Sequence, residues 1–142
     1  MKKWIFACLV VLFGCFACVS TTKTVLKPGM PNTLKLSNGE VVYDLSGEWD
    51  LITRVRGYVF GGMLEIKQNE DRFVGTLKSG KYPQSGEIVK GSLKGGEMTN
   101  LEFNAPSRGW LKSDGEILDG GKRITISSPT VDRTYDSTLT KR

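Results

Sequence analysis

Hydrophobic and polar residues alternate along much of the chain after residue 46. In the segment 47–56, one face of an extended strand would carry Trp49, Leu51, Thr53 and Val55, while charged residues occupy most of the other face. A period of two residues is typical of a β-strand that is buried on one side. No period of 3.6 residues persists over three helical turns, so we expect an all-β protein.

Turn-forming residues divide this pattern into short segments. Glycine, proline, asparagine and aspartate recur between apolar stretches, with a turn expected at 57–61 and a longer loop at 79–83. Short connections favour antiparallel neighbours, so the expected topology is an up-and-down meander that closes into a small barrel. Eight strands are expected, at 47–56, 63–68, 72–78, 87–93, 98–104, 110–118, around Ile124 and Ile126, and at 135–141.

A short hairpin is expected before the barrel. Leu34 and Leu36 alternate with polar residues, and Asn38-Gly39 separates them from the apolar segment 41–43. Asparagine and glycine both tolerate positive φ, which makes this pair a strong signal for a two-residue hairpin turn.

The first 14 residues have the features of a secretory signal peptide. Two lysines precede an apolar run of ten residues, 4–13, which is too short to cross a bilayer core of about 30 Å as a helix. The run ends in Leu12-Phe13-Gly14-Cys15, which resembles the lipobox of bacterial lipoproteins. The resemblance implies a diacylglyceryl group on the Cys15 thiol and cleavage before that residue.

Cys18 is the alternative lipidation site and would leave no unpaired thiol in the mature chain. An ordinary signal peptide or an uncleaved anchor with incidental cysteines is a further alternative. Neither cysteine is followed by the aspartate associated with inner-membrane retention of enteric lipoproteins, so the outer membrane is expected where two membranes exist. We therefore expect a signal peptide at 1–14, a flexible tether at 15–32 and a barrel domain at 33–142, held at the bacterial cell envelope.

The expected first strand opens with Gly47-Glu48-Trp49. This motif resembles the glycine, any residue, tryptophan motif of the lipocalins and the wider calycin group, which are eight-stranded barrels that carry small apolar ligands or bind other proteins. In that family the tryptophan closes the barrel floor and a basic residue from the last strand packs across it. The resemblance implies that Lys141, or Arg142, lies over Trp49 in a cation–π contact.

The composition argues against an enzyme and against a metal site. Histidine is absent, and all three cysteines lie within the first 18 residues. The carboxylate pairs Glu48 with Asp50 and Asp114 with Glu116 each share one face of a strand, but on the expected parity both face solvent. No histidine is present to activate a serine or threonine. We expect no catalytic residue, no metal and no cofactor.

The charge distribution argues against a nucleic-acid ligand. Removal of Lys2 and Lys3 with the signal would lower the formal net charge from +5 to +3, and the remaining charges alternate in sign. The segment 56–61 is similar to the aromatic strand of RNA-binding RRM domains, but it departs from that motif at Val59, and the chain lacks the RRM helices.

Two binding functions remain open. In the first, the barrel interior holds a small hydrophobic ligand or lipid. In the second, the interior is filled and the exterior binds a protein partner, as an inhibitor, adhesin or assembly factor. The filled interior would consist of Trp49, Leu51, Leu64, Phe73, Leu77, Phe103, Ile124 and Leu139. The expected binding rim consists of the aromatic residues Tyr58, Phe60, Tyr82 and Trp110.

Overall fold

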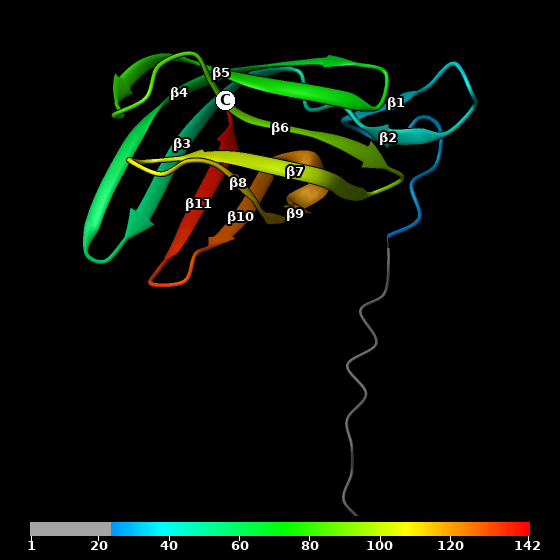
Figure 1. The fold of residues 1–142 in the computed structure, drawn as a ribbon. Helices are drawn as coiled ribbons and strands as arrows, with labels where there is room; N and C mark the ends of the chain where they lie inside the picture. Colours follow the sequence, from blue (N-terminus) through cyan, green and yellow to red (C-terminus); the bar gives the residue numbers. More distant parts are fainter. Residues whose placement is uncertain (1–23) are drawn as a thin grey trace, which may run out of the picture.

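The computed structural model describes residues 24–142, and within them the chain is almost entirely β-structure (Figure 1). The elements are β1 (Thr33–Lys35), β2 (Val41–Tyr43), β3 (Gly47–Val55), β4 (Tyr58–Asn69), β5 (Arg72–Lys81), β6 (Glu87–Lys94), β7 (Glu97–Ala105), β8 (Gly109–Lys112), β9 (Asp114–Leu118), the short 3-10 helix η1 (Asp119–Gly121), β10 (Arg123–Pro129) and β11 (Thr134–Lys141). The predicted all-β class is confirmed.

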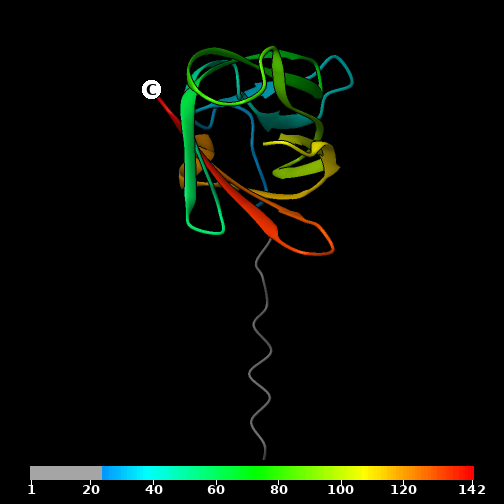
Figure 2. The same cartoon turned by 60° about the vertical axis from the view of Figure 1, so that its left-hand side comes forward.

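Nine strands form one antiparallel sheet in the order β8-β7-β6-β5-β4-β3-β11-β10-β9. Strands that are neighbours in the chain pair with one another, except β8 and β9, and β11 also pairs with β3. The sheet curls around a common interior, as Figure 2 shows. Its two edge strands, β8 and β9, are separated in the chain by Ser113 alone. The predicted meander therefore forms a nearly closed barrel.

The predicted strand 110–118 is two strands, because its halves pair with different neighbours. β8 pairs with β7, whereas β9 pairs with β10. At the break, the Ser113 amide donates a hydrogen bond of 2.9 Å to the Leu101 carbonyl. A register irregularity between β6 and β7, together with the positive φ of 48° at Asn100, interrupts the regular course of β7. Such an irregularity bends a strand, and β9 packs against β7 without pairing with it.

The predicted turn at 57–61 was wrong. Val55 pairs with Tyr58, so the turn contains only Arg56 and Gly57, and β4 continues through Gly61 and Gly62. Glycines there indicate close approach of two backbones rather than a turn.

The predicted loop at 79–83 was also partly wrong, because β5 extends to Lys81 and pairs there with β4. A Cβ added to Gly80 would lie 2.3 Å from the Gly62 Cα. Only glycine fits on both strands where they cross so closely, and turn-forming residues therefore lie within paired strands.

The predicted hairpin is present as β1 and β2, although its loop has three residues rather than two. The Gly39 amide donates to the Leu36 carbonyl at 2.9 Å, and only Gly39 of the expected Asn38-Gly39 pair has a positive φ, of 88°. This is the pattern of a three-residue loop with glycine in the left-handed position.

The hairpin covers one end of the barrel, which we call the capped end. Glu40 Oε1 accepts a hydrogen bond of 2.7 Å from the Gly95 amide, and Glu70 Oε2 accepts one of 3.0 Å from the Ser37 amide. Both acceptors link the hairpin to connections between barrel strands. Val42, in β2 of the hairpin, is fully buried.

Residues 24–32, expected as part of a tether, contact the capped end. Leu26 is partly buried against the hydrophobic core. Asn32 Nδ2 donates to the Gly120 carbonyl at 3.1 Å, and the Asn32 carbonyl accepts from the Asp44 amide at 2.8 Å. These contacts place Leu26 and Asn32 against the barrel domain. The predicted signal peptide, both candidate lipidation cysteines and the rest of the tether lie outside the described residues.

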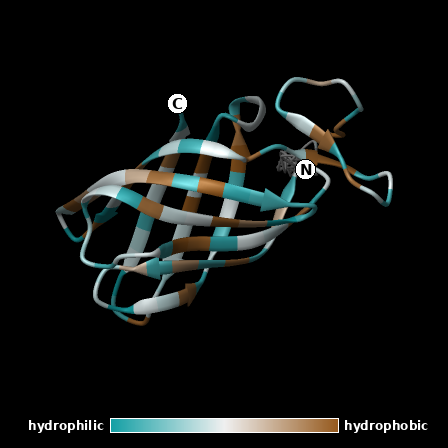
Figure 3. Cartoon of the chain, turned by 90° about the horizontal axis from the view of Figure 1, so that it is seen from above, coloured by the Kyte–Doolittle hydropathy of each residue, from teal (hydrophilic) through white to brown (hydrophobic). Residues whose placement is uncertain are grey.

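The interior of the barrel is packed with large side chains. Burial alternates along β3 as expected, and Figure 3 shows the alternation of apolar and polar residues on the strands. Gly75 and Gly91 leave room for larger neighbours: an added Cβ would lie 2.6 Å from Val89 Cγ1 at Gly75 and 3.0 Å from the Phe73 ring at Gly91. The largest fully buried side chains are Trp49, Tyr135, Phe73, Phe103, Leu45, Leu51, Leu64, Ile66, Ile88, Ile124, Leu139 and Val42.

Trp49 occupies the interior at the capped end. Its indole is fully buried, and Nε1 donates a hydrogen bond of 2.8 Å to the Leu45 carbonyl. Lys141 Nζ lies 5.7 Å from the ring centroid and donates to the Asp44 carbonyl at 2.9 Å. Arg142, the alternative, instead bonds Asp50. The structure thus places Lys141 where the lipocalin resemblance implies a cation.

Candidate binding surface

The end of the barrel opposite the hairpin is formed by four connections, and we call it the distal end. They are the β3–β4 turn at 56–57, the β5–β6 connection at 82–86, the β7–β8 turn at 106–108 and the β10–β11 turn at 130–133. An antiparallel meander places alternate connections at the same end of a barrel. Figure 3 shows this end away from the hairpin and from the start of the described chain.

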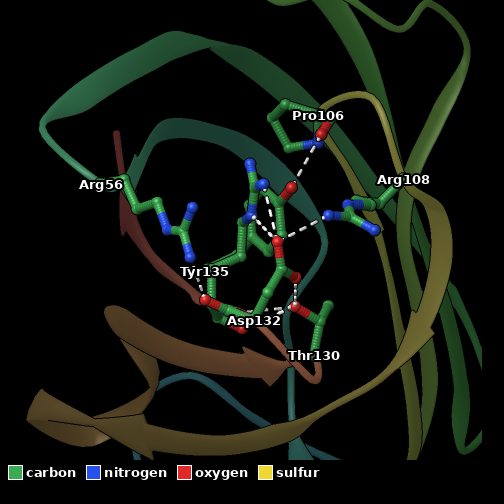
Figure 4. A network of polar contacts seen from close by, with 7 residues as sticks. Arg56, Pro106, Arg108, Thr130, Asp132 and Tyr135 are labelled. Atoms are coloured by element: carbon green, nitrogen blue, oxygen red, sulfur yellow. Dashed lines mark hydrogen bonds and ion pairs between the residues drawn. The ribbon is translucent and has the colours of Figure 1, made fainter.

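Side chains from three of these connections meet at Asp132 (Figure 4). Arg108 Nη2 and Arg133 Nη2 lie 2.9 Å and 2.8 Å from Asp132 Oδ2, and Arg133 Nε donates to the same oxygen at 3.0 Å. Thr130 Oγ1 donates to Asp132 Oδ1 at 2.9 Å. The cluster joins the β7–β8 and β10–β11 turns through charge-assisted hydrogen bonds, which are stronger than neutral ones.

Arg56 links a third connection to this cluster. Its Nη2 donates to the Asp132 backbone carbonyl. Arg56 and Gly57 have φ values of 43° and 79°, as a two-residue type I′ hairpin requires. An arginine in the left-handed region costs about 1–2 kcal/mol, and the hydrogen bond from its side chain offsets part of that cost.

The arginines also determine the ionisation of Asp132. Hydrogen bonds from Arg133 and then Thr130, reinforced by the charges of Arg108 and Arg133, lower the pKa of Asp132 to about 2. The same pairing with Asp132 raises the pKa of Arg133. The cluster therefore stays fully charged at neutral pH.

The connections between barrel strands carry opposite net charge at the two ends. The four distal connections contain three cations, Arg56, Arg108 and Arg133, and one carboxylate, Asp132. The three barrel connections at the capped end contain three carboxylates and one cation, namely Glu70, Asp71, Asp119 and Lys122. The arginine cluster thus gives the distal end a surplus of positive charge, which favours an anionic partner there.

Apolar side chains are exposed at the same end of the barrel. Tyr58 is 70% exposed, Val59 is 64% exposed, and Val131 at the tip of the β10–β11 turn is completely exposed. Tyrosine and arginine are enriched at the energetic centres of protein interfaces. Tyr58 is the member of the predicted rim that the structure leaves most open to solvent.

Phe60 and Tyr82 form a single cluster at the same end. Their rings meet edge to face, with centroids 6.1 Å apart at an angle of 72°. The Tyr82 hydroxyl donates to the Asn104 carbonyl at 3.1 Å, and burial raises the pKa of Tyr82. Both rings are partly buried against the core, so they support the distal surface rather than projecting from it.

Trp110, the fourth predicted rim residue, lies on the outer wall. Lys90 Nζ is 4.3 Å from its ring centroid, and Lys90 also lies 3.4 Å from Glu102 Oε2. Trp110 pairs with Asn104, whose carbonyl receives the Tyr82 hydroxyl. The structure therefore brings Phe60 and Tyr82 together, places Tyr58 near the arginines and sets Trp110 apart from them on the side of the barrel.

Polar groups beneath the distal end hold its connections in place. The buried Tyr135 hydroxyl donates to the Pro106 carbonyl at 3.1 Å, and Gln84 Nε2 donates to the Ala105 carbonyl. Thr53 and Ser137, both buried, share a hydrogen bond of 2.8 Å. Buried polar networks of this kind fix a unique geometry when their members are paired.

A cleft of about 920 Å³ lies at the capped end, between the start of the described chain and residues of β2, β7 and β9. Leu26, Tyr43, Met98 and Ile117 supply its apolar lining, and Glu40 is among the carboxylates that border it. It lies outside the packed interior and was not predicted from the sequence.

The predicted carboxylate pairs lie on the outside of the barrel. Glu48, Asp50, Asp114 and Glu116 are all exposed, and Asp50 is paired with Arg142 at 2.7 Å. Among residues 24–142, no group of three or more His, Cys, Asp or Glu side chains is placed to hold a metal ion. In the same part of the chain, no helix combines the length and apolar character needed to cross a membrane.

The arginine cluster is the feature of the distal end that sequence reasoning missed. Its members are spread over residues 56–133 and carry no local motif. One signal was present: Arg56, Arg108 and Arg133 all lie in turns, and in a meander these turns alternate with those of the other end. Counting turn charges separately for the two ends would have indicated the positive surplus, although not the contacts with Asp132.

Comparison with protein-family models, with curated proteins and with solved structures found no match for this chain.

Proposed function

We propose that this protein is a lipid-anchored lipoprotein of the bacterial cell envelope whose filled barrel binds a protein partner through its distal end, without catalysing a reaction. The observation that carries the proposal is the arginine cluster of Arg56, Arg108 and Arg133 beside exposed Tyr58, on a barrel whose interior is occupied. Arginine and tyrosine on a positioned surface are suited to protein recognition.

The packing of the interior supports an external site. Trp49, Phe73 and Phe103 are buried in the barrel. Neighbouring side chains pack so closely against Gly75 and Gly91 that a Cβ atom there would be crowded. A ligand in the lumen would have to displace close-packed side chains, whereas a partner at the distal end displaces solvent.

The position of the N-terminal segment supports the same orientation. Residues 24–32 contact the capped end, so an acyl anchor on Cys15 or Cys18 would enter the membrane on that side. The distal end would then face away from the lipid and be accessible to other envelope proteins. Where the cell has two membranes, we propose the outer one.

Site-specific photo-crosslinking tests the binding function. A benzophenone side chain at Val131 or Tyr58, in cells of the source organism, should yield a discrete protein adduct on irradiation. The same group at Lys94, on the capped end, is the matched control and should not yield that adduct. If neither distal position gives an adduct while the protein is present and folded, the proposed function is wrong.

Fatty-acid labelling tests the anchor. Cys15→Ser should abolish incorporation of radioactive palmitate, while Cys18→Ser should leave it unchanged. The reverse pattern would assign lipidation to Cys18. If neither the wild type nor either variant incorporates palmitate, membrane anchoring by an acyl chain is contradicted.

A small apolar ligand is a second candidate function, favoured by the cleft at the capped end. Its volume of about 920 Å³ lies within the range of small-molecule sites. Native mass spectrometry of the mature chain from its own membranes should then show a non-covalent adduct that is lost under denaturing conditions. Met98→Glu should remove this adduct, and identical native and denatured masses would contradict this function.

A further inference from the structure

The arginine cluster holds one carboxylate and has donors to spare. Among the described residues, Arg56 and Arg108 each contribute only Nη2 to their bonds with Asp132, whereas Arg133 contributes both Nε and Nη2. A guanidinium has five N–H donors and pairs best with a carboxylate through two parallel bonds. Arg133 directs two donors and Arg108 one donor at the same oxygen, Oδ2 of Asp132, so neither arginine forms two parallel bonds with the two carboxylate oxygens.

The cluster is also accessible from solvent. The exposed fractions of the side chains are 41% for Arg108, 37% for Asp132 and 29% for Arg133. Val131 in the β10–β11 turn and Tyr58, the first residue of β4, are exposed at the same end and offer apolar contact area there. A partner segment that binds here can thus meet guanidinium and apolar groups together.

From these observations we infer that the distal end binds an acidic segment of its protein partner, rich in Asp or Glu, and that Asp132 competes internally with the partner's carboxylates for Arg108. This inference rests on the proposed function and adds the chemistry of the partner. The position now held by Asp132 shows that the cluster accepts a carboxylate, and the surplus positive charge means that a second one is attracted.

The internal competition has a specific consequence. Asp132→Asn frees Arg108 and raises the positive charge of the distal end, so an acidic ligand binds more tightly. If Asp132 only held the turns in position, its loss would loosen the arginines and weaken binding. The direction of the change therefore separates a competing carboxylate from a structural one.

A labelled octaglutamate peptide is the probe, with octaglutamine as the neutral control, and fluorescence anisotropy with the full mature chain is the measurement. Octaglutamate should bind, octaglutamine should not, and binding should weaken between about 20 mM and about 300 mM salt because the charges are solvent-exposed. Arg108→Gln should weaken binding about fivefold, which corresponds to about 1 kcal/mol, and Asp132→Asn should strengthen it by a similar factor.

Matched changes at the capped end serve as controls for net charge. Arg123→Gln and Asp119→Asn break a surface ion pair there and should leave octaglutamate affinity nearly unchanged. Equal effects of Arg108→Gln and Arg123→Gln would mean that only net charge matters, and weaker binding by Asp132→Asn would refute the competition. Circular dichroism of each variant verifies folding, and Arg108→Lys, which keeps the charge but not the fork, provides a second variant with an intermediate loss.

The outcomes separate this inference from the proposed function. A crosslinked partner at Val131 without octaglutamate binding would leave the protein-binding function standing and overturn the acidic segment. Octaglutamate binding without any crosslinked partner would overturn the proposed function and leave the carboxylate site without a protein partner. Tripolyphosphate or anionic phosphatidylglycerol vesicles that displace octaglutamate at lower concentration would assign the cluster to phosphate instead.

Discussion

Lys141 lies over the face of Trp49 where the last strand of the barrel pairs with the first. The two residues are register partners of β11 and β3, with Nζ 5.7 Å from the indole centroid. The ammonium group also donates to the Asp44 carbonyl at 2.9 Å, in the segment that connects the hairpin to β3. The Lys141 side chain thus contacts both the first barrel strand and the segment that connects the hairpin to it.

Lys141→Met should destabilise the protein by about 1–3 kcal/mol, because it removes the cation–π contact and a charge-assisted hydrogen bond while keeping a similar apolar stem. Urea unfolding monitored by Trp fluorescence measures the change. Lys122→Met, at an exposed position of the same end, is the control and should be nearly neutral. Equal stability of the two variants would show that the Lys141 contact contributes nothing.

Gly75→Ala should destabilise the barrel by about 1–3 kcal/mol through overpacking. An added Cβ would lie 2.6 Å from Val89 Cγ1, and Val89 is itself buried. Val89→Ala in the same chain should recover part of the loss, so that the two changes are not additive in thermal or urea unfolding. Gly61→Ala, where the nearest atom is the Leu51 carbonyl oxygen at 3.4 Å, is the mild control. Additive losses would contradict close packing at this position.

Asp132 should make stability depend on pH in the acid range. Its pKa is lowered from an ordinary value of 3.8 to about 2, so the stabilisation is fully present above about pH 4 and is lost as the pH falls toward 2. The difference in stability between wild type and Asp132→Asn should shrink over that interval. Carboxyl-detected NMR titration should also give a low pKa that rises in Arg133→Gln. A normal pKa of Asp132 in the wild type would contradict its hydrogen bonds with Arg133 and Thr130.

Tyr82 should resist ionisation. Burial raises its pKa above the ordinary value of 10.0, so the folded state favours the neutral phenol, and its contribution to stability is lost as the pH rises through and above 10. Tyr82→Phe should lessen the alkaline loss of stability, while removing the hydrogen bond to Asn104 should cost about 0.5–1.5 kcal/mol at neutral pH. The difference in 295 nm absorbance between wild type and Tyr82→Phe follows this group during a pH titration; ionisation of Tyr82 at its ordinary pKa of 10.0 would refute the burial argument.

Local pattern was sufficient for the strands that have one buried face. Alternation along 47–56 predicted the buried face of β3, and each of Trp49, Leu51 and Val55 is buried. The same reasoning failed at Gly61-Gly62 and at Gly80, because glycine marks both a turn and a close crossing of strands, and only the neighbouring strand distinguishes them.

The arginine cluster shows the limit of sequence reasoning at the candidate site. Arg56, Arg108 and Asp132 belong to three turns that are far apart in the chain, and no spacing rule connects them. Their meeting depends on the curvature of the whole sheet. Of the predicted aromatic rim, Tyr58, Phe60 and Tyr82 lie toward one end and Trp110 lies on the side of the barrel, and their division into exposed and supporting residues depends on packing.

By itself, the sequence determined the all-β class, the hairpin before the barrel and the faces of most strands, because alternation and turn chemistry act over a few residues. The tertiary structure alone decided that the strand at 110–118 breaks at Ser113, that the hairpin and residues 24–32 cover one end, and that three arginines meet one aspartate at the other. These features depend on contacts between segments distant in the chain, whose geometry is set by the closure of the sheet and not by any local pattern.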